Sequence, residues 1–181
     1  MERDGFEYIE NLVSKLDNRF RYALEVRESS WFSDKVSDFL KENGMSHVWS
    51  IRDELKAPPI VTSNQIYIRF IGDRSINEKD FGKIVKDRER ETKEYVDHIK
   101  RTRQDDADGQ HHQMAIVFNN HFAGFGPQSA NEFLKLMNKP EVDWKGALQQ
   151  KQDSSASLDS ETQQHHQQQQ QQTSISDFTH Y

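Results

Sequence analysis

Three side chains that bind polar groups or move a proton follow a short apolar run in the second half of the chain. The run is Ala115–Phe118, and Asn119, Asn120 and His121 come directly after it. A glycine-rich turn and apolar residues at helical spacing follow, so we expect the order strand, polar tip, loop and helix. Because α/β proteins bind ligands at the carboxyl ends of their strands, this order predicts a site at the tip.

Charged side chains lie at corresponding places in two further predicted strands. Residues 21–27 alternate so that Glu25 and Arg27 share one face, and residues 65–71 carry Arg69 near their carboxyl end. Two charges on one strand face suit the mouth of a barrel. The alternative is an edge strand whose outer face is solvated.

The residue types favour anion binding combined with acid–base chemistry. Arginine grips phosphate or carboxylate with two parallel hydrogen bonds, while asparagine both donates and accepts. Glu25 acts either as a general base or as the residue that orients the arginines. His121 shuttles a proton near neutral pH, and Trp31, in the loop after the first strand, stacks on a base or sugar. The alternative is a buried polar network that closes the end of a barrel.

We therefore divide the candidate site into two groups. The expected catalytic residues are Glu25 and His121, and the expected ligand-binding residues are Arg27, Trp31, Arg69, Asn119 and Asn120. The residues predict where a site lies but do not name a reaction.

The elements that must position these residues alternate along the chain. Ser33 is the expected N-cap of one helix, and Gly44 is the glycine expected after its end. Strands that alternate with helices predict an α/β fold of parallel strands joined by right-handed crossovers. The expected helices are 6–16, 34–43, 81–102 and one from about 128, and the expected strands are 21–27, 46–51, 65–71 and 115–118.

Length and composition predict one domain and a tail. The chain has 181 residues, a formal charge of −6 and no cysteine, which excludes a disulfide framework and thiolate metal sites. A mildly acidic chain argues against strong non-specific binding to nucleic acid but allows a local basic pocket. With no secretory signal and no apolar run of membrane-spanning length, we expect a soluble, cytoplasmic protein without membrane partners.

No cofactor or metal is expected. The histidines do not fall at metal-ligand spacings. The sequence also lacks a P-loop, a G-x-G-x-x-G fingerprint and a G-x-S-x-G elbow.

The composition changes at residue 149. Residues 1–148 have the pattern of a folded domain, whereas 149–181 are rich in Gln, Ser and His and are predicted to be disordered. Near the end of this tail, Gln172, Ile175 and Phe178 resemble a sliding-clamp-binding peptide, although Thr179 stands where such peptides usually have a second aromatic residue. A solvated tail end is the alternative.

Three segments together resemble the YecE-like TIM-barrel family, also called domain of unknown function 72. They are ALEVRESSWF at 23–32, YIRFIGD at 67–73 and IVFNNHFAGFGPQSANEF at 116–133. The resemblance implies a TIM (β/α)8 fold with its site at the strand ends, but the family has no established reaction to carry over. Ile71 stands where the family usually has histidine, and that imidazole's role is lost or moved to His121.

The resemblance covers only the C-terminal half of such a barrel, which leaves two sheet edges open. The chain is then a gene fragment or wrong start, a half that pairs with a separate N-terminal half or with itself, or a stable reduced α/β layer. Three functions follow as hypotheses. The protein binds a phosphate-bearing or nucleic-acid-related ligand, acts as a non-catalytic interaction protein recruited to DNA by its tail, or is a truncated inactive fragment.

Overall fold

The computed structural model describes residues 3–105, 112–144 and 146. The chain divides into two units, Met1–Glu141 and Val142–Tyr181. In the second unit, the backbone N–H of Gly146 donates a hydrogen bond of 2.9 Å to the side chain of Asp143. The predicted disorder of 149–181 and the clamp-like residues Gln172, Ile175 and Phe178 lie outside the described residues.

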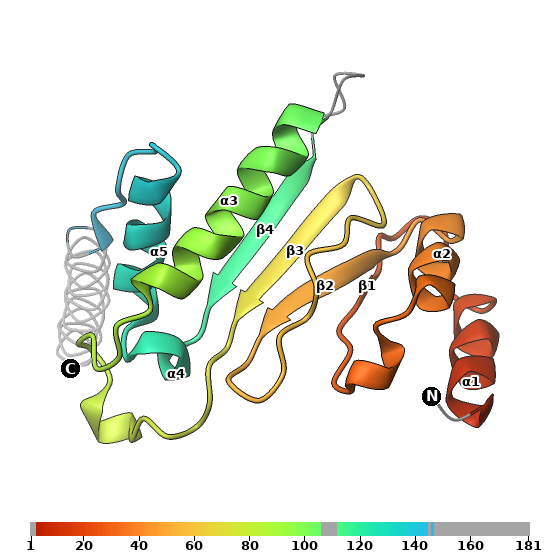
Figure 1. Ribbon diagram of the computed structural model, residues 1–181, viewed down its shortest axis with the longest axis horizontal. Coiled ribbons are helices and arrows are strands. Elements are labelled where there is room, and N and C mark those ends of the chain that lie inside the picture. Colours follow the sequence, from red (N-terminus) through yellow and green to blue (C-terminus); the bar gives the residue numbers. More distant parts are fainter. Residues whose placement is uncertain (1–2, 106–111, 145, 147–181) are drawn as a thin grey trace, which may run out of the picture. The chain divides into compact units, whose positions relative to one another are not determined.

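Four parallel strands form one sheet in the order of the chain (Figure 1), which confirms the predicted α/β class. The two middle strands carry apolar residues at alternate positions, and the ladder between β3 and β4 pairs six residues on each side. The strands are β1 Ala23–Leu24, β2 Ser46–Ile51, β3 Gln65–Phe70 and β4 Gln113–Phe118.

Helices lie between β1 and β2 and between β3 and β4, whereas β2 and β3 are joined by a loop without a helix, and the predicted caps of α2 Asp34–Glu42 are present. The hydroxyl of Ser33 accepts a hydrogen bond from the backbone N–H of Val36, and Gly44 adopts a φ of 61° just past the helix end. The helices are α1 Arg3–Val13, α2 Asp34–Glu42, α3 Glu89–Asp105, α4 Asn120–Ala123 and α5 Gly126–Leu136, with single 3-10 turns η1 Ser29–Trp31 and η2 Glu78–Asp80.

The helix predicted over 81–102 was wrong at its start, because α3 begins only at Glu89. Before it, the backbone N–H of Gly82 donates to the carbonyl of Gly124 at 3.2 Å, and that of Val85 donates to the carbonyl of Ala123 at 2.7 Å. This segment therefore satisfies its backbone groups on a distant loop instead of within a helix. The first strand is also shorter than predicted, since only Ala23–Leu24 of residues 21–27 pairs in the ladder.

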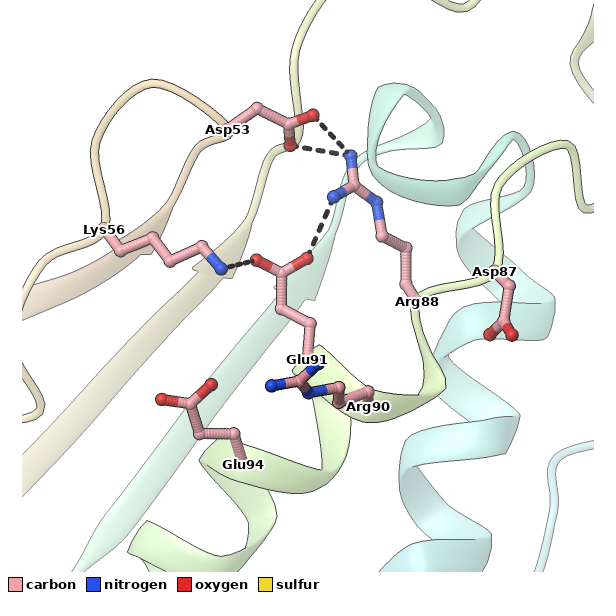
Figure 2. Close-up of a pocket in the computed structure, with 7 residues that line it drawn as sticks. All are labelled: Asp53, Lys56, Asp87, Arg88, Arg90, Glu91 and Glu94. Carbon is pink, nitrogen blue, oxygen red and sulfur yellow. Dashed lines mark hydrogen bonds and ion pairs between the residues drawn. The ribbon is translucent and has the colours of Figure 1, made fainter.

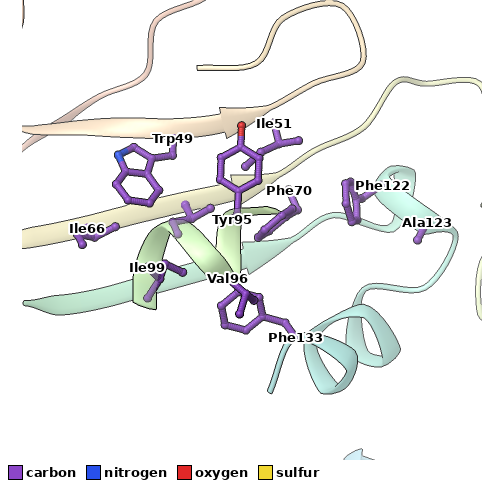
Figure 3. Packing of buried hydrophobic residues seen from close by; sticks show 11 residues of the cluster. Trp49, Ile51, Ile66, Phe70, Tyr95, Val96, Ile99, Phe122, Ala123 and Phe133 are labelled. Carbon is purple, nitrogen blue, oxygen red and sulfur yellow. The ribbon is translucent and has the colours of Figure 1, made fainter. Parts of the chain in front are cut away.

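The apolar core lies between one face of the sheet and the helices (Figure 3). Ile66, Ile68 and Phe70 of β3 are almost fully buried on this face, and the ring of Phe70 stacks on that of Phe118 at 4.4 Å. Helices α3 and α5 contribute Tyr95, Val96, Ile99 and Phe133 to the same core. A second cluster joins α1 and α2 to the same side of β1 through Phe6, Val36, Leu40 and Leu24.

The opposite face of the sheet, which we call the inner face, carries the alternate residues of each strand. The register places Ser50, Arg69 and Val117 side by side on it. The guanidinium of Arg21 donates a hydrogen bond of 2.7 Å to the side chain of Gln113, from before β1 to β4. Flat strands would hold β1 and β4 about 14 Å apart with side chains upright, so this contact indicates a sheet that curves toward its inner face.

Candidate functional site

A cavity of about 900 Å³ opens at the carboxyl edge of the sheet, and we call it the carboxyl-edge cavity. Four of the seven predicted site residues line it, namely Arg27, Arg69, Asn119 and His121. Its location follows from the parallel sheet, because the carboxyl ends of parallel strands meet at one edge.

Glu25 is not among the residues that line this cavity, but it contacts two of the arginines that do. One carboxylate oxygen accepts a hydrogen bond of 3.0 Å from Arg52, and the other accepts one from Arg69. Arg27 is more distant, at 3.8 Å. Burial acts to raise the pKa of Glu25, but the hydrogen bonds and charges of Arg52 and Arg69 outweigh it and hold the pKa below its usual value. The carboxylate thus accepts hydrogen bonds from two arginine side chains, and its role as a general base or as an orienting residue stays a prediction.

Arg52 and Arg74 also line the cavity and were not among the predicted site residues. Arg52 directly follows β2, as Asn119 directly follows β4, so its position at a strand end was a usable signal. Arg74 lies further along, beyond the turn at Gly72, where nothing in the local pattern marks it. In the part of the chain that the structure describes, no ion pair involves Arg74.

The nearest acidic residue to Arg74 in sequence is already compensated. Asp73 accepts hydrogen bonds from Ser75 and ion-pairs with Lys86 at 3.0 Å. The hydrogen bonds from Ser75, followed by that of Lys86, hold the pKa of Asp73 well below its usual range. Asp73 therefore contributes little uncompensated negative charge to the cavity.

The two asparagines hold the backbone turns after β4. The side-chain oxygen of Asn119 accepts from the backbone N–H of His121 at 3.0 Å and caps α4. The side-chain oxygen of Asn120 accepts from the backbone N–H of Gly126 at 2.8 Å, at the start of α5. Asn119 lines the cavity, whereas Asn120 is not among its lining residues.

His121 lines the cavity, and one of its ring nitrogens is buried beneath the surface. Its ring packs edge-on against Phe81, with centroids 4.9 Å apart. The ring Nδ1 atom is buried and has no hydrogen-bond partner among the described residues. Ile71, the position where the resembled family usually has histidine, lines the same cavity. His121 therefore lines the cavity to which that family histidine would also belong.

Trp31 does not line the carboxyl-edge cavity. Its ring packs near Phe6 of α1, with centroids 6.5 Å apart. It lines another groove, of about 300 Å³, together with Ile9 and residues 24–28, which begin at the last residue of β1. Its predicted stacking on a ligand stays a prediction.

A second cavity, of about 480 Å³, is lined by charged side chains that form ion pairs with one another (Figure 2). The guanidinium of Arg88 contacts Asp53 at 2.6 Å and Glu91 at 3.0 Å, and Lys56 pairs with Glu91 from the other side. Arg88 also donates to the carbonyl of Phe122 at 2.9 Å. These bonds join the loop after β2, the start of α3 and α4, so they serve the fold that holds the carboxyl edge.

The described residues contain neither a metal-binding cluster nor a membrane-spanning helix. No group of three or more His, Cys, Asp or Glu side chains is placed to hold a metal ion. No helix there is both long enough and apolar enough to cross a membrane.

Comparison with known proteins identifies the relatives of this arrangement. Residues 1–154 match the family described as "Protein of unknown function DUF72". A DUF72 family protein from Thermotoga maritima matches with a TM-score of 0.55 and 22% identity, over 76% of this chain and 52% of that chain. One from Enterococcus faecalis matches with a TM-score of 0.59 and 20% identity, over 77% of this chain and 57% of that chain. The chain thus spans just over half the length of these TIM-barrel-like structures. No curated protein matches it.

Proposed function

The chain belongs to the DUF72 family, whose activity is not established, and we propose that its carboxyl-edge cavity binds a phosphate-bearing ligand, including one that is part of a nucleic acid. The observation that carries the proposal is the set of four arginines on the cavity, Arg27, Arg52, Arg69 and Arg74. Arginine is the side chain best suited to two-pronged recognition of phosphate.

The charge balance of the cavity supports an anionic ligand. Three carboxylates also line it, from Glu54, Asp73 and Glu78, but Asp73 is paired with Lys86. Arg27 is 68% exposed, with only a distant contact to Glu25. Arg27 and Arg74 therefore have guanidinium groups available to a ligand.

The volume and the remaining groups also fit. Small-molecule sites typically have volumes of about 300–1,000 Å³, and the cavity is near the upper end of that range at about 900 Å³. The oxygen of Asn119 is committed to the backbone, so its NH2 group remains to donate to the ligand. His121 also lines the cavity and contributes an imidazole ring to it.

Glu25 acts in this proposal as a positioning residue. By holding Arg52 and Arg69 with both of its oxygens, it fixes two guanidinium groups before a ligand arrives. A pre-ordered arginine loses less side-chain freedom on binding, which improves affinity.

The test is a calorimetric titration of the full chain with inorganic phosphate, a nucleoside monophosphate and a short 5′-phosphorylated oligonucleotide. We expect Arg27→Gln and Arg74→Gln each to weaken binding by about tenfold, equivalent to about 1.4 kcal/mol. Arg101→Gln on α3 is the matched control, because it removes the same charge from an exposed residue outside the cavity. The proposal fails if none of the three probes binds at millimolar concentration, or if the control weakens binding as much as the cavity variants.

A further inference from the structure

Both outer strands of the sheet have an edge that no other strand covers among the described residues. β1 pairs only with β2, and β4 pairs only with β3. β4 is six residues long and largely apolar, with the sequence QMAIVF. A long apolar edge with unpaired backbone groups recruits another strand or aggregates, so a soluble fold requires a cover for it.

The inner face of the sheet is also exposed where β4 forms it. Ser50, in the middle of the sheet, is fully buried, whereas Val117, on the same face of β4, is 45% exposed. The helices pack on the opposite face. The contact between Arg21 and Gln113 shows that the inner face is concave, like the inside of a barrel wall.

A groove lies along the other open edge. The five consecutive residues 24–28 line it, and Ile9 and Trp31 form its far wall. Val26 is buried and Arg27 is exposed, so the alternation of a strand continues past Leu24 although no partner strand is present among the described residues. An extended apolar segment placed here gains main-chain hydrogen bonds along β1, as in β-strand addition.

We infer that the segment that fills this groove is β4 of a second copy of this chain. Two copies related by a twofold axis place β4 of each beside β1 of the other, and the two seams are identical by symmetry. Four strands from each copy give the eight parallel strands that close a barrel. The length agrees, because one copy spans 52–57% of the TIM-barrel-like chains that it matches.

The closed pair has a consequence for the carboxyl edge. The partner copy contributes the missing half of the rim, so each carboxyl-edge cavity faces its symmetry mate across the barrel mouth. The inference does not depend on the proposed function, because the association is measured without any phosphate ligand.

The first experiment is sedimentation equilibrium of the full chain between 1 and 100 µM in a phosphate-free buffer. We expect a mass twice that of the 21.3 kDa chain. Val117→Arg is expected to weaken association at least tenfold. Val85→Arg is the matched control, because Val85 is equally exposed, at 48%, and lies on the loop before α3. A monomer at 100 µM, or a dimer that Val117→Arg leaves unchanged, overturns the inference.

A second experiment covers the case in which Val117→Arg fails to fold. The chain has no cysteine, so single cysteines can be introduced at Ala23 on β1 and at Ala115 on β4. A short thiol cross-linker is expected to join the two variants only when they are mixed, since each seam pairs β1 with β4. Cross-linking of Ala115→Cys with itself shows instead that two β4 edges pair, and it overturns the proposed arrangement.

Discussion

Replacing Gly72 by alanine tests how closely the turn after β3 approaches the turn after β4. Gly72 has a φ of 72°, and a Cβ atom there would lie 2.7 Å from the Cα of Phe122 and closer still to the carbonyl oxygen of His121. Both are backbone atoms, so no side-chain rotation relieves the overlap. Gly44→Ala is the matched control, since Gly44 has a φ of 61° and nothing within 4 Å of the added atom.

The two variants separate backbone strain from overlap. A left-handed conformation costs an L-residue about 1–2 kcal/mol, so the free energy of unfolding falls by this amount in both variants. Overpacking destabilises Gly72→Ala alone by about 1–3 kcal/mol more. At about 3–4 °C per kcal/mol for a domain of this size, Gly72→Ala should melt roughly 3–12 °C below Gly44→Ala.

The assay is thermal and urea unfolding followed by circular dichroism, with all variants at one protein concentration. We also expect Gly72→Ala to weaken phosphate binding, because Gly72 and His121 both line the carboxyl-edge cavity. Equal losses of stability in the two variants would refute the close approach of the two turns.

Three further predictions concern ionisable groups. Glu25→Gln should lower the free energy of unfolding by about 1–3 kcal/mol at pH 7. Because the pKa of Glu25 is lowered in the folded state, this difference from wild type should shrink as the pH falls below about 4. Acid unfolding curves of the two proteins that stay parallel contradict this. Burial raises the pKa of Tyr95 to about 12, so wild type should lose roughly 2 kcal/mol as the pH rises from 10 to 12 and Tyr95→Phe should not, as measured by urea unfolding. Arg88→Gln should cost about 1–3 kcal/mol and less in 1 M salt, because Arg88 bridges Asp53 and the start of α3; a loss that is independent of salt would show that packing dominates.

The secondary structure was predictable where local signals decide it. The segments that form β2 and β3 are rich in apolar and aromatic residues, and turn residues lie at their ends. Ser33 and Gly44 marked the ends of α2 because capping depends on neighbours within a few residues. The order of strands and helices then left a parallel sheet as the simplest arrangement.

The prediction failed where a distant segment decides the local structure. Ile84 and Val85 fit the apolar stripe of a helix, but the backbone N–H of Val85 bonds to Ala123, nearly forty positions away. Trp31 followed a predicted strand end, yet it packs on Phe6 of α1, a contact that no local pattern contains. Tertiary contacts of this kind override propensity and spacing.

The site was predictable by position more than by role. Arg69, Asn119 and His121 reached the cavity because residues at strand ends of a parallel sheet converge. Asn120 follows the same strand but is turned to the start of α5, since the tight turn leaves a backbone N–H that needs an acceptor. Which of two adjacent side chains faces a cavity depends on turn geometry, which the sequence pattern does not specify.

The hydrogen bond between Arg21 and Gln113 also bears on the order of folding. It joins residues 92 positions apart, whereas β2 and β3 pair across about 19 positions. Closing a long loop costs more chain entropy, so the β2–β3 pair has the kinetic advantage and the approach of β1 to β4 comes late. Until β1 and β4 add to it, the β2–β3 pair exposes both of its own edges, and this interval is when a folding nucleus is most vulnerable to mispairing.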